Sequence, residues 1–407
     1  MDIHLTLRRN PDNTLRGEAV CENISGNYDF ALDKNFAIQS IGGLSFEITH
    51  TMADLYRDDT NALVYLKANI YRIEGDIPAT LKIEYEYTGN FSSDIAFNRI
   101  SDEMIALDAL YINFYPVPIA REVTEKIRPY TKFEAGKEAP IVFGQFTFAV
   151  EGFEPYRVIN CEDGRIKQFC AIVPFKLLAV NESKILKKEH SNAAVYYFNA
   201  KESAKAAKTA EEASRILKWY SEDLFRDFTS PERMFFVSYG GKKMNGFNRS
   251  ITVEVERLYR PGTHRGRQLL AHEIAHHWCM SEPPAVWNEQ MLAEGCVEWS
   301  YLLYSLSRGR FSFASARLYL AHNYFAARIY WKLFEIKHRR KDYSPHQHGY
   351  RMFRDIYKKH GKGVLENCIR RFVSIETKTM DSFLAAVKAN EPAEVYASVK
   401  CLAKKYL

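Results

Sequence analysis

The stretch Ala271–Trp278, with the sequence AHEIAHHW, constrains this 407-residue chain more than any other part. His272, Glu273 and His276 form the pattern HExxH. Residues four apart on a helix lie on the same face, so the two imidazoles can bind one zinc ion while the glutamate faces a water molecule on the metal. Chance alone produces HExxH in roughly a few percent of chains of this length. The motif therefore needs a carrier helix, a third ligand and a substrate cleft from the rest of the chain.

Catalytic zinc takes three protein ligands and keeps a fourth position for water. In the run AVWNEQMLAEGCVEWSYLL, Glu294 is the favoured third ligand. Its helix follows the Pro283-Pro284 turn, where the HExxH helix cannot continue, so the two helices can fold back onto one ion. Glu289 and Glu282 are the competing carboxylates. Glu289 would face another side of the helix, and Glu282 lies in the turn.

Composition gives weaker constraints on compartment and partners. The net charge of +6 is mild, and no basic stripe with interleaved aromatic residues indicates a nucleic-acid partner. Seven cysteines without a CxxC pair favour free thiols in a reducing compartment. Neither a signal-peptide core nor an apolar run of about 18 residues occurs. We therefore expect a cytoplasmic protein that binds neither nucleic acid nor membrane.

The N-terminal half has the pattern of short β-strands. Leu81–Tyr87 alternates apolar with charged residues, which predicts a strand with one buried face. Further runs of this kind occur at His4–Arg8, Ser45–His50, Gln145–Val150 and Gln168–Val173. Many short strands separated by turn residues indicate a sandwich or saddle-like sheet. We expect an all-β domain over residues 1–188.

The second half, residues 189–407, is mainly helical in pattern. Asn199, with Glu202 three residues later, is a capping-box-like start for a helix over residues 200–228. The remaining expected elements are strands at Val195–Phe198, Met234–Tyr239 and residues 248–256, helices at Arg265–Trp278 and Asn288–Leu306, and helices beyond Phe313. Strands that give way to helices predict an α+β chain of two domains, with the chemistry in the second.

HEIAHHW followed by LAEG resembles the zinc peptidases of the alanyl aminopeptidase and leukotriene hydrolase family, the gluzincins. That family's pattern is HExxH, eighteen residues and then Glu-Gly, whereas seventeen residues separate His276 from Glu294 here. The domain order also resembles the family's, although weakly outside residues 230–300. The resemblance implies a thermolysin-like, mainly helical zinc peptidase domain behind the all-β domain. It also implies a short form without the family's later domains.

The resemblance assigns a role to each motif residue. His272, His276 and Glu294 would hold one zinc ion, and Glu273 would be the general base of peptide hydrolysis. Glu273 would take a proton from the zinc-bound water, whose pKa the metal lowers to about 7, and deliver it to the leaving amine. Glu298, one turn after Glu294, can accept a hydrogen bond from a ligand histidine and fix its orientation. A solvated helix carboxylate is the alternative for Glu298.

A first departure from the family concerns the substrate's α-amine. The family has a Gly-x-Met-Glu-Asn loop whose glutamate binds this amine, and an ungapped count places Gly246-Phe247-Asn248-Arg249 there. The neutral Asn248 would bind an ammonium group less well than a carboxylate. Gly246, Phe247 and Asn248 remain the expected substrate-binding residues, because this loop and the next strand can pair with a peptide backbone.

A second departure concerns the oxyanion. The family has a tyrosine in a Tyr-x-Lys-Gly helix start, and this chain has the sequence YSPHQHGY over residues 343–350. His346 stands in register with the tyrosine, and Tyr343 is a nearby substitute, so both are candidate oxyanion donors. His348 replaces the lysine. A surface or helix-capping side chain is the alternative for all three residues.

The sequence thus predicts an aminopeptidase-like zinc metallopeptidase that hydrolyses a peptide substrate. Exopeptidase and endopeptidase action both stay open because Asn248 replaces the expected glutamate. A zinc-binding but catalytically weak scaffold or binding protein is a second hypothesis, and an accidental HExxH is a third. The set of His272, Glu273, His276 and Glu294 favours an enzyme, since structural zinc sites are more often closed by four protein ligands. The oligomeric state is not predicted.

Overall fold

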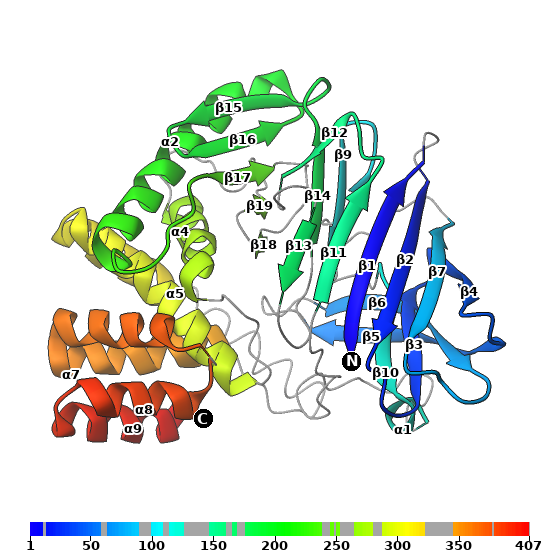
Figure 1. Ribbon diagram of the computed structural model, residues 1–407. Helices are drawn as coiled ribbons and strands as arrows, with labels where there is room; N and C mark the ends of the chain where they lie inside the picture. Colours follow the sequence, from blue (N-terminus) through cyan, green and yellow to red (C-terminus); the bar gives the residue numbers. More distant parts are fainter. Residues whose placement is uncertain are drawn as a thin grey trace. The chain divides into compact units, whose positions relative to one another are not determined.

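A computed structural model of the chain separates into two compact units. The first consists mainly of Met1–Leu186, and the second contains Lys187–Gly240 and Met244–Leu407. The structure describes residues 1–10, 14–57, 63–88, 99–108, 114–125, 146–159, 165–168, 176–237, 245–247, 250–252, 264–279, 287–321, 345–376 and 378–406. The mixed α+β class predicted from the sequence is confirmed: β-sheets come first along the chain and a helical region follows (Figure 1).

In the first unit, the described strands form three sheets (Figure 1). Their orders are β13-β11-β1-β2-β7-β4, β10-β3-β6-β5 and β12-β14-β9-β8. The strands are β1 (Asp2–Arg9), β2 (Leu15–Glu22), β3 (Tyr28–Asp33), β4 (Phe36–Ile41), β5 (Phe46–Arg57), β6 (Leu63–Ile73), β7 (Leu81–Tyr87), β8 (Arg99–Ile100), β9 (Met104–Asp108), β10 (Val117–Ala120), β11 (Phe146–Glu151), β12 (Tyr156–Val158), β13 (Arg165–Gln168) and β14 (Lys176–Asn181). Among the described residues of this unit, one helical turn, α1 (Arg121–Thr124), follows β10.

Strand β7 shows why alternation predicted the N-terminal strands well. Leu81, Ile83 and Tyr85 are buried, whereas the intervening Lys82 and Glu84 are exposed. The runs expected near residues 4–8, 45–50 and 145–150 lie in or next to β1, β5 and β11. The run expected at 168–173 stays a prediction, because its first residue ends β13 and residues 169–173 lie outside the described part.

Strand pairing in the six-stranded sheet joins distant parts of the chain. Strand β1 pairs in parallel with β11, with Ile3 opposite Phe146, and antiparallel with β2 on its other side. The His4 ring is 2.7 Å from the hydroxyl of Thr147 across this parallel pair. Alternation within a strand says which face is buried but not which strand lies beside it, so this order is a finding of the structure.

The second unit begins with a five-stranded sheet in the order β15-β16-β17-β19-β18 (Figure 1). The strands are β15 (Leu186–His190), β16 (Ala193–Tyr197), β17 (Met234–Val237), β18 (Asn245–Phe247) and β19 (Ser250–Thr252). Strands β16, β17 and β19 are parallel, and β18 runs antiparallel to β19. Helix α2 (Ser203–Trp219) connects β16 with β17 and packs on β16. Parallel neighbours require such a crossover connection.

The helix expected over residues 200–228 is shorter than predicted and divided. Asn199 does cap its start, because its side-chain oxygen accepts a hydrogen bond of 3.0 Å from the Lys201 amide, but the capped turn is the 3-10 segment η1 (Ala200–Glu202). At the other end, α2 widens into the π-helical turn η2 (Tyr220–Leu224). There the Phe225 amide donates to the Tyr220 carbonyl five residues earlier, at 2.7 Å. This wide turn ends the helix at Leu224.

Five helices complete the described part of the second unit, together with helical residues 310–321. They are α4 (His264–Cys279), α5 (Trp287–Ser307), α7 (Pro345–Ser374), α8 (Met380–Asn390) and α9 (Ala393–Tyr406). The two helices predicted around the motif agree with α4 and α5 within one residue. Helix α5 packs against both α4 and α7 (Figure 1). Within α7, Gly361 has a φ of 82°, which interrupts the helix.

Helix α5 is enclosed on all sides along most of its length. Every residue from Met291 to Ser305 is buried. A helix that is apolar all round suits such a position, but Glu294 and Glu298 lie within this stretch. A buried carboxylate is costly unless charged or hydrogen-bonding partners surround it. Glu294 and Glu298 are therefore expected to face charged or hydrogen-bonding side chains.

Two further expectations concern cysteines and membranes. Five cysteines lie in the described part and all are free, which confirms the prediction of free thiols for them: Cys21, Cys279, Cys296, Cys368 and Cys401. None of the helices described here combines the length and the apolar character that crossing a bilayer requires.

Candidate metal centre

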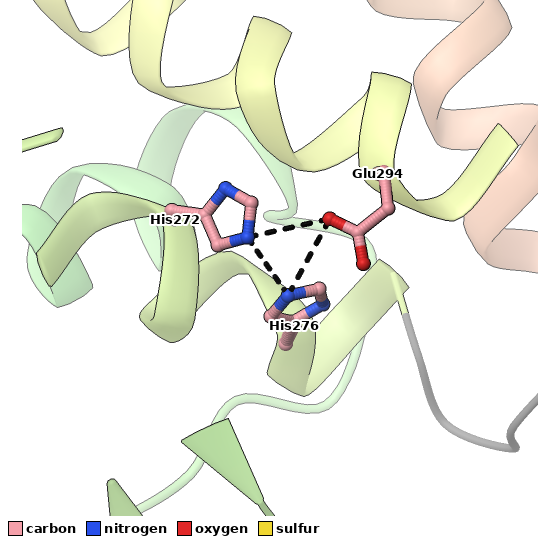
Figure 2. A group of neighbouring side chains, drawn as sticks. All are labelled: His272, His276 and Glu294. Atoms are coloured by element: carbon pink, nitrogen blue, oxygen red, sulfur yellow. Dashed lines mark hydrogen bonds and ion pairs between the residues drawn. The ribbon is translucent and has the colours of Figure 1, made fainter. Parts of the chain in front are cut away.

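Three side chains predicted as metal ligands meet between α4 and α5 (Figure 2). His272 and His276 lie one turn apart on α4, and Glu294 faces them from α5. The two Nε2 atoms are 3.1 Å apart. Oε2 of Glu294 lies 3.3 Å from Nε2 of His272 and 3.9 Å from Nε2 of His276. The fold-back predicted for the two helices thus brings all three donor atoms together.

These distances fit a zinc ion. Zinc bonds to nitrogen and oxygen are about 2.0–2.2 Å long, so ligand atoms at tetrahedral angles lie about 3.3–3.5 Å apart. Two of the three separations are close to this spacing, and the third is slightly longer. Oε2 of Glu294 is buried and has no hydrogen-bond partner among the described residues. This oxygen and the two imidazole nitrogens face one another without forming a hydrogen bond to the oxygen. Such an arrangement suits a cation that all three atoms bind.

Burial and neighbouring charges set the protonation of the three ligands. Burial alone would raise the pKa of Glu294, but His346, His276 and His272 outweigh it and hold that pKa well below its usual range. Burial lowers the pKa of His276 to about 3. Burial acts in the same direction on His272, but contacts with Glu294 and Glu298 raise its pKa well above the ordinary value. An ionised carboxylate and a neutral imidazole are the forms that bind metals, so only His272 has a proton to lose.

Glu298 lies on the Nδ1 side of His272, although Nδ1 has no hydrogen-bond partner among the described residues, so the predicted hydrogen bond stays a prediction. Oε1 of Glu298 is 3.5 Å from Nδ1 of His272, and Glu298 is only 3% exposed, so the alternative of a solvated carboxylate is wrong. The buried Gln268 donates from Nε2 to both carboxylate oxygens, at 3.3 and 3.2 Å. Gln268 was missed in the sequence. The available signal was its position four residues before His272, on the same face of the helix.

His346 joins the centre from the first turn of α7. Its Nδ1 lies 3.0 Å from Oε2 of Glu294 and 3.9 Å from Oε1 of Glu298. The His346 ring stacks on that of His272, with centroids 5.4 Å apart. His346, His272 and Glu298 form a second group of possible metal donors whose atoms lie within 4.8 Å of one another. The alternative of a surface side chain does not hold for His346, which is 16% exposed.

Two glycines allow the helices that carry these residues to approach closely. A Cβ atom on Gly349 of α7 would lie 2.2 Å from the Met291 carbonyl oxygen and 2.7 Å from the Gly295 nitrogen, both on α5. A Cβ atom on Gly295 would in turn lie 2.8 Å from the Gly349 backbone. Only residues without a side chain fit at this crossing. Since Gly295 follows Glu294 and Gly349 lies three residues after His346, the crossing brings these two side chains together.

The other predicted site residues are placed less completely. Glu273 is buried on α4, next to His272. Gly246 and Phe247 form β18, opposite Ile251 and Ser250 of β19, and only their backbone is described.

The remaining predicted positions either lie outside the described residues or lie away from the centre. Tyr343, Asn248 and the competing Glu282 lie outside the described residues, and the side chain of Glu289 is not described. His348 lies apart from the centre, because its Nδ1 is 2.9 Å from the Tyr406 carbonyl oxygen.

Comparison with known proteins shows the fold alone. No family model matches the sequence, and no curated protein does. Among solved structures, leukotriene A4 hydrolase from Saccharomyces cerevisiae is similar with a TM-score of 0.57 and 13% identity, over 98% of this chain and 66% of that one. Aminopeptidase A of Legionella pneumophila, in complex with aspartic acid, is similar with a TM-score of 0.58 and 12% identity, over 98% of this chain and 49% of that one. The chain thus spans two thirds or less of the length of these proteins.

Proposed function

We propose that this chain is a zinc-dependent metallopeptidase, an aminopeptidase-like hydrolase of peptide bonds. The observation that carries the proposal is the meeting of His272, His276 and Glu294 beside the buried Glu273. The likeness in fold to an aminopeptidase and to leukotriene A4 hydrolase supports it. Bound zinc would act as a Lewis acid and would lower the pKa of a water ligand. Its ligands would be the two imidazole Nε2 atoms and Oε2 of Glu294.

The residues around the ligands can supply the proton transfers and the orientation. In this proposal Glu273 accepts a proton from the attacking water and returns it to the leaving amine. Glu298, to which Gln268 donates, lies 3.5 Å from Nδ1 of His272 and would orient this ring by accepting a hydrogen bond from Nδ1. Such partners behind a ligand histidine fix its orientation and raise its basicity.

The peptide substrate would bind along β18. This strand is the last in the sheet order β15-β16-β17-β19-β18, and α4 packs against it. An extended peptide can add to such an edge through backbone hydrogen bonds. Gly246, Phe247 and Asn248 would then contact the substrate. Whether they select a free α-amine depends on Asn248, so the proposal includes both exopeptidase and endopeptidase action.

The experiment combines metal analysis with two kinds of fluorogenic peptide, one with a free α-amine and one with a blocked amine. We expect about one zinc ion per chain and cleavage of at least one peptide. Glu273→Gln should keep the metal and reduce kcat by about 10²–10⁴-fold, the usual contribution of general acid–base catalysis. Glu222→Gln, at an exposed helical position, is the matched control and should change neither. Full activity of Glu273→Gln would refute the mechanism, and cleavage of only the blocked peptide would remove the aminopeptidase label.

A zinc-binding scaffold is the second candidate function. The observation in its favour is that His346, which lies beside Glu294, stands in register with the tyrosine that stabilises the oxyanion in the resembled family. A protein that holds zinc tightly and cleaves neither peptide would support the scaffold over the peptidase.

A further inference from the structure

Helical residues 310–321 of the second unit expose two large apolar side chains on one face. Among the described residues four large apolar side chains are exposed, and the two most exposed lie on this helix: Phe311 at 86% and Leu318 at 73%. Single exposed apolar residues are common on protein surfaces. Residues seven apart, however, lie on the same side of a helix, so these two belong to one surface. Adjoining exposed apolar residues mark interaction sites.

The opposite face of the same helix already attaches it to the core of the second unit. Ala316 and Leu320 are buried in that core. Phe313 packs against it, and its ring centroid lies 5.8 Å from that of Tyr357 on α7. These contacts hold the helix in place without the two exposed side chains. Because a helix that is apolar on all sides is normally buried on all sides, the exposed face is expected to be covered by a binding partner.

The exposed face has the spacing of a coiled-coil seam. Phe311 and Leu318 occupy position a of a heptad, and Ala314 and Ala321, which are also exposed, occupy position d. These four residues form an apolar seam. Helices pair through positions a and d, where side chains of one helix insert between those of the other. The two alanines leave room beside the two large residues, so apolar side chains of a second helix can insert there.

Positive charge follows one edge of the seam. Arg310 and Arg317, both exposed, occupy position g, and residues 310–321 include no acidic residue. Charges at positions e and g pair with opposite charges on the other helix and thereby select the partner. A second copy of this helix would place arginine opposite arginine in antiparallel orientation, and opposite the neutral Ser315 in parallel orientation. Only a partner helix with acidic residues beside its apolar stripe gains from the two arginines.

A bilayer surface suits this seam less well than a helix does. Binding of a helix to a membrane interface increases with the apolar area that it buries. Two of the four seam residues are alanines, which contribute little area to a bilayer. Between larger residues, the same alanines are what a close helix–helix contact requires.

We propose that the apolar seam binds an amphipathic helix of another protein, one with acidic residues beside its apolar stripe. Large apolar side chains of the partner would insert beside the two alanines, and its carboxylates would face the two arginines. The seam contains none of the residues of the candidate metal centre, so the inference does not depend on the proposed function.

The probe is a synthetic peptide of about 21 residues with Leu at positions a and d and Glu at positions e and g, long enough to form a helix when bound. Fluorescence anisotropy follows its binding to the full chain. We expect the wild type to bind this peptide and not the same peptide with Lys in place of Glu. Phe311→Ser and Leu318→Ser should each weaken binding by about tenfold or more, because each side chain is buried on binding.

Charge reversal provides a test that loss of fold cannot imitate. The double variant Arg310→Glu, Arg317→Glu should lose the Glu peptide and bind the Lys peptide. Leu186→Ser, the same substitution at another exposed leucine, is the matched control for Leu318→Ser and should not change binding. Since all these positions are exposed, each variant should melt within about 2 °C of wild type.

Failure of the wild type to bind the Glu peptide, or equal binding of both peptides, would overturn the proposal. Co-sedimentation with vesicles of phosphatidylserine and phosphatidylcholine tests the membrane, and sedimentation velocity tests a second copy of the chain. Vesicle binding that Leu318→Ser abolishes would assign the seam to a bilayer. A dimer that Leu318→Ser dissociates would assign it to self-association. Either result would contradict the proposal.

Discussion

The crossing of α5 and α7 gives a prediction whose size follows from the structure. In Gly349→Ala, the new Cβ would lie 2.2 Å from the Met291 carbonyl oxygen. The closest favourable carbon–oxygen contacts are about 3.3 Å, so the two helices would have to separate by about 1.1 Å. The groups it meets on α5 are backbone atoms of Met291 and Gly295, which no change of rotamer can move aside.

The expected cost lies at the upper end of the range for overpacked cores, about 3 kcal/mol. For a unit of this size each kcal/mol lowers the melting temperature by about 2–4 °C, so the variant should melt about 6–12 °C below wild type. Melting followed by circular dichroism measures this shift.

Gly363→Ala is the matched control on α7, beyond the interruption at Gly361. A Cβ atom there meets nothing within 4 Å, and alanine is favoured over glycine in a helix by about 0.5–1 kcal/mol. This variant should melt at or slightly above the wild-type temperature. If Gly349→Ala melts like Gly363→Ala, the two helices do not cross at these glycines, and the account of how Glu294 meets His346 is wrong.

Two further predictions concern pH. In chelator-treated protein the raised pKa of His272 keeps its ring protonated at neutral pH. Zinc binding should therefore release about one proton, and zinc affinity should increase as pH rises towards that pKa. Calorimetry in two buffers of different ionisation enthalpy measures the proton release, and its absence would contradict the prediction. In the first unit, burial raises the pKa of Asp29, but Arg72, Thr124 and Arg121 outweigh it and keep it below its usual value. The stabilisation is therefore present above the unfolded pKa of about 3.9 and is lost as pH falls. Asp29→Asn should cost about 3 kcal/mol in urea unfolding at pH 7 and progressively less as pH falls below about 3.9, and a cost that does not change with pH would be evidence against the charged pair.

The sequence predicted those parts of the molecule that depend on local periodicity. Strand β7 alternates in sequence and in burial over the same residues, and the bounds of α4 and α5 differ from the prediction by one residue. His272 and His276 were brought together by helix geometry alone. Glu294 was predicted because a double proline forces the chain to turn between the two helices.

The sequence did not predict contacts that depend on tertiary packing. His346 and Glu294 are separated by dozens of residues, and their contact depends on the glycine crossing between α5 and α7. Gln268 was missed for the same reason, because its hydrogen bond to Glu298 depends on how α5 packs against α4. The π-helical turn at Tyr220 was missed for a different reason, since helical periodicity does not distinguish α from π turns over five residues.

The parallel pairing of β1 with β11 has a consequence for synthesis of the chain on the ribosome. His4 and its partner Thr147 are 143 residues apart. At about 5–20 residues per second, β1 is made roughly 7–29 s before the strand that covers its second edge. Until then that edge presents unpaired backbone groups, on which strands of other chains can pair. The charged Arg8 on β1, which later pairs with Glu151 of β11, discourages such pairing during this interval. We therefore expect the first unit to be most prone to pairing with strands of other chains between the synthesis of β1 and that of β11.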